Sequence, residues 1–197
     1  MSGLGGAIRR LVRAMRVTRF PDRDEIVSLD LETTSLDPKT AVILSIAAVP
    51  IRQRRIVLSE RFTRIVCSDG GVDREAVKYH RLRPVDVAQG VPAGDAASQL
   101  VDWLADRPLI GYCIGFDVST IDRALRDRGV EGFDVERFDL RDLYRMRAMR
   151  RNPDGALPGN LDAILAELAV PAVGRHTALG DATAVAMAYL ALRYGSN

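Results

Sequence analysis

The 197-residue sequence has little cysteine, two histidines and almost no lysine, and its apolar runs are short. Cys67 and Cys113 lie far apart in the sequence, which predicts neither a disulfide framework nor a zinc site. The longest nearly apolar runs, 41–51 and 182–192, span eleven residues each, whereas a membrane-spanning helix needs about 20. Arginines interrupt the apolar residues at the N-terminus, so no signal peptide is evident. These absences predict a cytoplasmic protein without a membrane span.

Hydrophobic residues make up 47% of the chain and charged residues 27%, a composition typical of one globular domain. The net charge of +2 is unevenly distributed, because residues 1–20 contain five arginines and no acid. The other 177 residues carry 23 basic and 26 acidic side chains. A general basic coat for nucleic acid is therefore absent, and any contact with nucleic acid must come from local patches or metal ions.

Residues 7–17 have apolar side chains at helical spacing with arginines between them, which predicts a basic amphipathic helix. We therefore separate an N-terminal segment, 1–20, from a main domain over 21–197. The helix has three alternative roles, namely packing on the domain, contacting nucleic acid or lying on a membrane surface.

The main domain has the pattern of a mixed α/β fold. A short polar connection at 51–54 predicts a hairpin, and residues 68–90 have an irregular pattern. The expected strands are 25–31, 41–50, 54–63, 109–111 and a short one at 138–140. The expected helices are 95–105 with Asp95 as N-cap, one from about Asp117, one from 140 to about 150, 161–168 and 181–193. An antiparallel meander followed by alternating helices and short strands predicts one mixed central sheet flanked by helices.

Asp30 and Glu32 stand two residues apart in the first expected strand. Because side chains alternate along a strand, both acids lie on one face, and Val27, Leu29 and Leu31 lie on the other. Two neighbouring carboxylates repel each other, and a bound cation with a preference for oxygen ligands removes that cost. The alternative is a solvated strand face that carries two ordinary surface acids.

Two further acids, Asp117 and Asp181, stand beside apolar residues at expected helix starts. Metal-dependent phosphodiester cleavage needs several carboxylates around two cations and a base that deprotonates water. An aspartate at a helix start is otherwise most often an N-cap. His176, five residues before Asp181, is either a base or an ordinary surface residue, and His80 is interpreted as a surface residue.

In this order, the segments Asp30-Leu31-Glu32-Thr33-Thr34, Gly115-Phe116-Asp117 and His176-x₄-Asp181 resemble the DEDDh 3′→5′ exonucleases. More narrowly, they resemble the branch that contains the proofreading epsilon subunit of bacterial DNA polymerase III, and the resemblance covers residues 24–193. It implies an RNase H-like fold, and it identifies an enzyme that hydrolyses single-stranded DNA ends to nucleoside 5′-monophosphates.

The same resemblance assigns roles to individual residues. Its metal ligands would be Asp30, Glu32, Asp117 and Asp181, holding two divalent ions, Mg²⁺ or Mn²⁺. His176 would be the general base, a role that suits a side chain titrating near neutral pH. Thr33 would lie beside the terminal nucleotide, and Leu36 would contact its base.

The sequence departs from the family pattern at three places. Ser35 replaces a glycine that usually follows the first motif, and Tyr112-Cys113 replaces a common His-Asn pair before the third acid. These positions bear on substrate contacts rather than on the metal ligands. The sequence also lacks the long C-terminal tail of the epsilon subunit and a clamp-binding segment, so association with a polymerase or clamp is not supported.

Two alternative functions remain open at this level. The first is the same chemistry on RNA, since the site that would contact the 2′-hydroxyl cannot be located in the sequence. The second is a non-catalytic nucleic-acid-binding or scaffold protein, which a complete set of four acids and one histidine makes less favourable.

Overall fold

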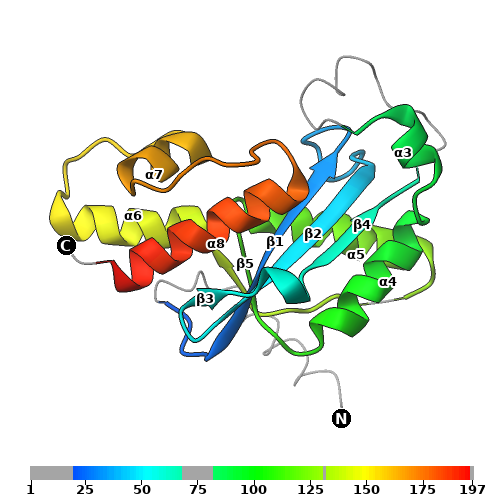
Figure 1. Ribbon diagram of the computed structural model, residues 1–197, viewed down its shortest axis with the longest axis horizontal. Coiled ribbons are helices and arrows are strands. Elements are labelled where there is room, and N and C mark those ends of the chain that lie inside the picture. The colour runs from blue at the N-terminus through cyan, green and yellow to red at the C-terminus, as the bar shows by residue number, and fades with distance from the viewer. Residues whose placement is uncertain (1–19, 68–81, 131, 196–197) are drawn as a thin grey trace, which may run out of the picture.

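The computed structural model describes residues 20–67, 82–130 and 132–195 (Figure 1). The basic helix expected over 7–17 and the surface position expected for His80 lie outside these residues. The division of the chain at residue 20 therefore stays a prediction.

A mixed sheet forms the centre of the molecule, and its described strands follow the order β3-β2-β1-β5-β6, with β4 also paired to β2. Strands β5 and β6 run parallel to β1, whereas β2 pairs with β1 antiparallel, which confirms the expected mixed sheet. The turn from β2 to β3 places Gln53 and Arg54 at positive φ, as in a tight two-residue hairpin. The strands are β1 (Glu25–Thr33), β2 (Ile43–Arg52), β3 (Arg55–Ile56), β4 (Phe62–Ile65), β5 (Leu109–Gly111) and β6 (Arg137–Asp139).

One expected strand is wrong, because residues 54–63 do not form a continuous element. The two-residue β3 is followed by a short 3₁₀ helix, η1 (Leu58–Glu60), before β4 begins at Phe62. The apolar side chains of this segment therefore do not share one strand face: Leu58 is exposed, while Phe62 packs in the core beside Trp103.

The helices begin earlier than the sequence predicts at three places. Helix α4 starts two residues before Asp95, and α5 and α8 each start three residues before their acid, Asp117 or Asp181. The whole of α3 also lies within 68–90, the segment expected to be irregular. The helices are α3 (Pro84–Ala88), α4 (Ala93–Leu104), α5 (Ile114–Asp127), α6 (Leu140–Arg151), α7 (Leu161–Glu167) and α8 (Ala178–Tyr194). Over the described part of the chain, no helix combines the length and the apolarity that crossing a membrane requires.

The N-cap residues explain why the helices start earlier, and they exclude the alternative that Asp117 and Asp181 are N-caps. The Thr177 hydroxyl accepts a hydrogen bond from the Gly180 amide (3.1 Å) and caps α8. Cys113 stands at the N-cap of α5, and Pro92 at that of α4, where the sequence predicts Asp95. Asp117 and Asp181 are therefore the fourth residues of their helices, and neither serves as an N-cap.

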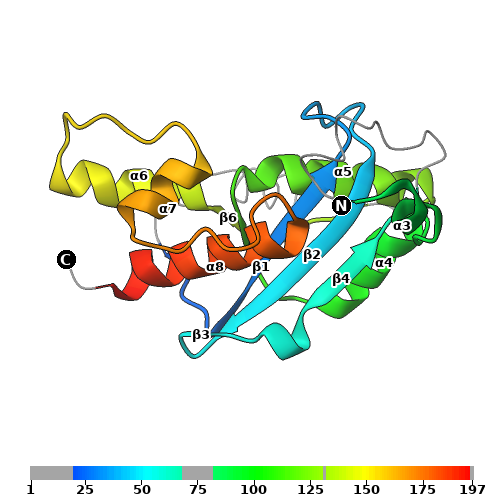
Figure 2. The same cartoon turned by 45° about the horizontal axis from the view of Figure 1, so that its top comes forward.

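Two helical layers cover the two faces of the sheet. Figures 1 and 2 show α4 and α5 on one side and α6, α7 and α8 on the other. Val27, Leu29 and Leu31 of β1 pack in the core with α4 and α5, as the strand alternation predicts. Ile26, by contrast, packs in the second core, which α6 to α8 form. Asp30 and Glu32 share the face of Ile26 and are thus directed toward α8.

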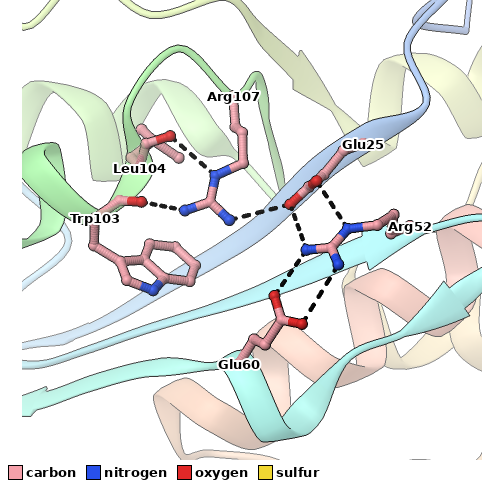
Figure 3. Close-up of polar contacts among 6 residues, drawn as sticks. All are labelled: Glu25, Arg52, Glu60, Trp103, Leu104 and Arg107. Atoms are coloured by element: carbon pink, nitrogen blue, oxygen red, sulfur yellow. Dashed lines mark hydrogen bonds and ion pairs between the residues drawn. The ribbon is translucent and has the colours of Figure 1, made fainter.

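An ion-pair network holds the beginning of β1, at the opposite end of the strand from the two acids (Figure 3). Glu25 accepts from Arg52 on β2 (Nε to Oε2, 2.9 Å) and from Arg107 after α4 (Nη1 to Oε1, 3.1 Å). Arg52 also contacts Glu60 of η1 (2.7 Å), and the Arg107 guanidinium lies 4.2 Å from the Trp103 ring centroid. The two guanidinium groups lower the pKa of Glu25. The network thereby joins β1, β2, η1 and α4 at this end of the sheet.

Candidate metal centre

The first two acids emerge from β1 opposite small residues of β2. Asp30 pairs in register with Ala47, and Glu32 with Ser45. Side chains directly opposite each other on antiparallel strands share a face, so these small neighbours leave space above the sheet. Asp30 and Glu32 are both half-buried and remain accessible to a small ion.

Helix α8 supplies the third acid, and a buried hydrogen bond fixes its position against β1. The Ser28 hydroxyl donates to the carbonyl oxygen of Ala182 (2.7 Å), and Ser28 is completely buried. Ser28 precedes Asp30 by two residues, and Ala182 follows Asp181 directly. Carboxylate oxygens of Asp30, Glu32 and Asp181 consequently lie within 4.8 Å of one another.

Asp117 lies behind this group of three and is not one of its members. It is only 4% exposed, and its Oδ1 accepts a hydrogen bond from the Leu31 amide of β1 (3.1 Å). The β1–β5 ladder extends only to Ser28, so Asp117 supplies the partner that β5 no longer offers to Leu31. Helix α5 is thereby attached to β1 between Asp30 and Glu32. Repulsion from the Asp117 carboxylate also raises the pKa of Asp30.

The segment before α8 carries His176 and a cation that contacts the acids. His176 has an exposed side chain and a positive φ of 63°, and its amide donates to Asp181 Oδ1 (3.1 Å). The Arg175 guanidinium forms an ion pair with the same oxygen of Asp181. Its Nε donates to Asp162 on α7 (2.7 Å). Arg175 therefore connects α7 to the acid cluster, next to the residue predicted to be the base.

Burial and mutual repulsion favour the protonated forms of the clustered acids. Burial, followed by repulsion from Asp117, raises the pKa of Asp30 well above its usual value. Burial likewise raises the pKa of Asp117, and it raises that of Glu32 to about 7, with repulsion from Asp181 adding to the effect. The charge of Arg175 opposes these shifts at Asp30 and Glu32. A divalent cation would stabilise the ionised forms in the same way and more strongly.

The donor set fits a hard divalent cation. Every member of the group of three is a carboxylate, and oxygen ligands favour Mg²⁺, Mn²⁺ or Ca²⁺ over softer metals. Neighbouring carboxylates that bear raised pKa values are costly to ionise without a cation. The arrangement can therefore hold a divalent ion and present it to an anionic ligand at the edge of the sheet.

The residues expected to contact substrate follow directly after the acids. Thr33 is half-buried and its hydroxyl donates to the Ser35 carbonyl oxygen (2.8 Å), whereas Leu36 is 90% exposed. Ser35 stands outside the left-handed region of φ, so the chain does not require glycine there. The Tyr112 ring lies 5.5 Å from the Arg141 guanidinium, and Cys113 has a positive φ of 59°.

Sequence reasoning missed three residues that position the site. Ser28 acts through a hydrogen bond to Ala182, and Asp162 acts through a hydrogen bond from Arg175. Both partners are distant in the sequence, so no local pattern identifies Ser28 or Asp162. Arg175 adjoins His176 in the sequence, and this adjacency is the one signal that could have found it. Its contacts with Asp162 and Asp181 depend on how α7 and α8 pack.

The carboxyl ends of the parallel strands β1, β5 and β6 share one edge of the sheet, and the acid cluster lies at this edge. Carboxylates clustered at this edge are suited to hold divalent ions against a phosphodiester, as metal-dependent nucleases require. The family model for exonucleases matches residues 27–189, and the chain belongs to the exonuclease family. Members of this family are nucleases that depend on divalent metal ions. No curated protein matches the chain.

Solved structures of nucleases share the fold. The crystal structure of cell-death related nuclease 4 (CRN-4) has a TM-score of 0.74 and 14% identity, over 85% of this chain and 62% of that one. E. coli exonuclease I in complex with a dT13 oligonucleotide has a TM-score of 0.70 and 18% identity, over 85% of this chain and 41% of that one. The zinc-bound complex of E. coli exonuclease I with single-stranded DNA has a TM-score of 0.67 and 19% identity, over 85% of this chain and 40% of that one.

This chain therefore spans between about two fifths and three fifths of the length of these nucleases. At such identities the likeness shows the fold, which is RNase H-like as expected. The exonuclease family is thus confirmed, while the resemblance to the epsilon branch stays a prediction.

Proposed function

We propose that this chain is a metal-dependent 3′→5′ exonuclease that hydrolyses single-stranded DNA ends to nucleoside 5′-monophosphates. The observation that carries the proposal is the convergence of Asp30, Glu32 and Asp181 within 4.8 Å, with Asp117 buried behind them. The match of residues 27–189 to the exonuclease family supports the same chemistry.

Each acid has a distinct part in this proposal. Asp30, Glu32 and Asp181 would hold the ions, and Asp117 would complete the ligand set while keeping β1 and α5 in register. Two bound divalent ions, Mg²⁺ or Mn²⁺, would supply Lewis-acid activation of the scissile phosphodiester and of the attacking water. The chain itself fixes the carboxylates beforehand, because buried hydrogen bonds to Ser28 and Leu31 set their positions.

His176 would be the general base that accepts the proton of the attacking water. Its backbone is held beside Asp181, and its exposed imidazole is available to solvent at the edge of the cluster. A base needs hydrogen-bond reach to the proton that it removes, and His176 would gain it by turning its exposed side chain toward the cluster. Thr33 and Leu36, which follow Glu32 in the chain, would contact the terminal nucleotide.

The proposal also includes a preference for DNA over RNA as substrate. The similar structures of E. coli exonuclease I contain DNA oligonucleotides, which favours DNA for this chain. Action on RNA is the second candidate, because the metal centre contacts phosphate groups that both polymers share. A 3′→5′ exonuclease of the epsilon-like branch would act in DNA replication or repair, in the cytoplasm.

Digestion of 5′-labelled single strands tests the proposal. With Mg²⁺ or Mn²⁺ we expect a ladder of products shortened from the 3′ end, and nucleoside 5′-monophosphates as the released product. Asp30→Asn and Asp181→Asn should each lower kcat by more than about 100-fold, since each removes a charge that holds an ion. The exposed Asp102→Asn is the matched control and should retain activity within about twofold. Intact substrate at high enzyme concentration with either metal would refute the proposal.

Matched DNA and RNA oligomers of one sequence decide the substrate. We expect a higher kcat/KM for DNA, and a reversed order would identify the chain as an exoribonuclease. Tight metal binding without turnover of either polymer would instead favour a nucleic-acid-binding protein.

A further inference from the structure

Positive charge is concentrated on one helix of the described fold. Helix α6 carries five arginines and a single aspartate. Acids equal or outnumber arginines and lysines on α3, α4, α5, α7 and α8. Two divalent ions would only balance the charge of four carboxylates, so long-range attraction of a polyanion must come from another surface. Among the described helices, only α6 offers a net positive charge for this purpose.

Helix α6 begins beside the start of α5, the helix whose first turn carries Asp117. Asp139, its N-cap, accepts from the Arg141 amide (2.9 Å) and from the Cys113 amide (3.3 Å) just before α5. The charge of Asp139 also raises the pKa of Asp117. Figures 1 and 2 show α6 leaving the sheet alongside α8, away from the end of β1. A chain whose end reaches the acids can therefore continue along α6.

A groove follows α6 on the side of α7. Its first part has a volume of about 300 Å³ and lies between Arg141 and Arg145 on one side and Leu157 and Pro158 on the other, with Asp142 also in its wall. Two arginines against one aspartate make this part positive. Tyr144 lines it and also the adjoining hollow of about 440 Å³, which contains Arg151 and Glu167. The groove thus extends along the helix, and its positive part lies nearer the start of α6.

The arginines of α6 divide into two groups. Arg147 donates to carbonyl oxygens at the end of α8, including that of Gly195 (3.2 Å), and so has a structural role. Arg145 is exposed, and in the described part of the chain its guanidinium has no hydrogen-bond or ion-pair partner. Arg141 is exposed as well and pairs only loosely with Asp139 (3.5 Å). The Arg145 guanidinium is therefore available to an anion, and that of Arg141 can bind one while it shares its charge with Asp139.

The spacing of Arg141 and Arg145 suits successive phosphates. Residues four apart lie on one helix face, about 6 Å apart along the axis. Like charges at this spacing destabilise a helix, and a bound anion removes that cost. Guanidinium groups bind phosphate through paired hydrogen bonds, and such contacts do not depend on the base sequence of the strand.

We propose that the groove along α6 binds the phosphodiester backbone of the single strand on the 5′ side of the scissile bond. Arg141 contacts the phosphates nearest the metal centre, and Arg145 contacts those one helical turn further away. The inference deepens the proposed function and rests on it. It identifies a sequence-independent subsite that makes turnover depend on substrate length and on salt.

The test compares a 12-nucleotide DNA strand with a dinucleotide, using wild type, Arg145→Gln and the double variant Arg141→Gln/Arg145→Gln. Arg150→Gln is the matched control, since Arg150 is exposed on the same helix but does not line the groove. For the double variant we expect about tenfold lower kcat/KM on the 12-mer, and a smaller 12-mer to dinucleotide ratio. The slope of log kcat/KM against log salt should fall by about 0.7 for each phosphate that the variant no longer binds.

A 12-mer kcat/KM and a salt slope equal to those of Arg150→Gln would overturn the proposal. Binding of a fluorescent 12-mer to the metal-free protein, followed by anisotropy, separates this failure from failure of the proposed function. If wild type cleaves neither substrate but binds the 12-mer more tightly than the double variant does, the groove stands and the catalytic proposal falls. Equal binding by all four proteins overturns the groove whatever the activity.

Discussion

The metal-free protein should lose stability as pH rises, because Glu32 has a pKa of about 7 where 4.5 is usual. The folded state holds this proton more tightly than the unfolded chain. The contribution to stability is therefore complete below about pH 4.5 and is lost as pH rises through about 7. The raised pKa values of Asp30 and Asp117 act in the same direction. Groups with lowered pKa values, such as Glu25, change stability only in more acidic solution.

The magnitude follows from the size of the shift. At 1.36 kcal/mol per pKa unit, the full shift of Glu32 corresponds to about 3 kcal/mol. Solvent reaches this half-buried side chain and screens part of the effect, so we expect about 1–2 kcal/mol. For a protein of this size, that difference changes the melting temperature by roughly 2–8 °C.

Urea and thermal unfolding in EDTA between pH 5 and pH 8 measure this effect, with Glu32→Gln as the perturbation. Wild type should lose about 1–2 kcal/mol more than Glu32→Gln over this range, and at pH 8 the variant should be the more stable protein. Adding Mn²⁺ should remove the loss, since bound ions hold the carboxylates in their ionised form. The exposed Asp102→Asn should behave like wild type. Wild-type stability that rises from pH 5 to pH 8 in EDTA, or an equal slope in Glu32→Gln, would refute the reasoning.

Three other substitutions test how the site is positioned. Gly180→Ala should lower the melting temperature and abolish nuclease activity, because its Cβ would overlap the carbonyl oxygen of Gly174 and displace the segment that carries His176. Arg175→Gln removes the guanidinium from Asp181, so by calorimetry it should bind Mn²⁺ more tightly, while the metal-free protein loses about 2 kcal/mol in urea. Ser28→Ala should cost about 1 kcal/mol and raise the Kd for Mn²⁺, since α8 is then without its buried hydrogen bond to β1.

Each of these expectations has a clear contrary result. Wild-type melting of Gly180→Ala would show that the preceding segment can move without cost. Weaker Mn²⁺ binding by Arg175→Gln would mean that the arginine orients Asp181 more than it competes with the ion. An unchanged Kd in Ser28→Ala would mean that the α8 acid is held by packing alone.

The part of the site that follows strand periodicity could be predicted from the sequence. Asp30 and Glu32 occupy one face of β1 because side chains alternate along a strand, and the core residues Val27, Leu29 and Leu31 confirm the alternation. Apolar runs also located most strands within about two residues, which is sufficient for the expected mixed sheet.

The helix starts could not be predicted in the same way. Aspartate is a common N-cap residue, which made Asp117 and Asp181 candidates, but the N-caps of α5 and α8 are Cys113 and Thr177. A cap at Cys113 requires a left-handed backbone in a residue that rarely adopts it, so local propensity gives no sign of it. The contacts of Arg175 depend on the packing of two helices and are likewise beyond a local pattern.

The hydrogen bond from the Leu31 amide to Asp117 has a consequence for how such a site can change over evolutionary time. One strand, β1, simultaneously fills the core with Leu29 and Leu31, displays two acids on its other face and binds a third acid through its backbone. Inserting or deleting one residue in β1 would exchange the two faces, so that leucines would meet α8 and carboxylates would enter the core. The register of β1 is therefore constrained twice, by the core and by the site, whereas loops and surface grooves can diverge without shifting either.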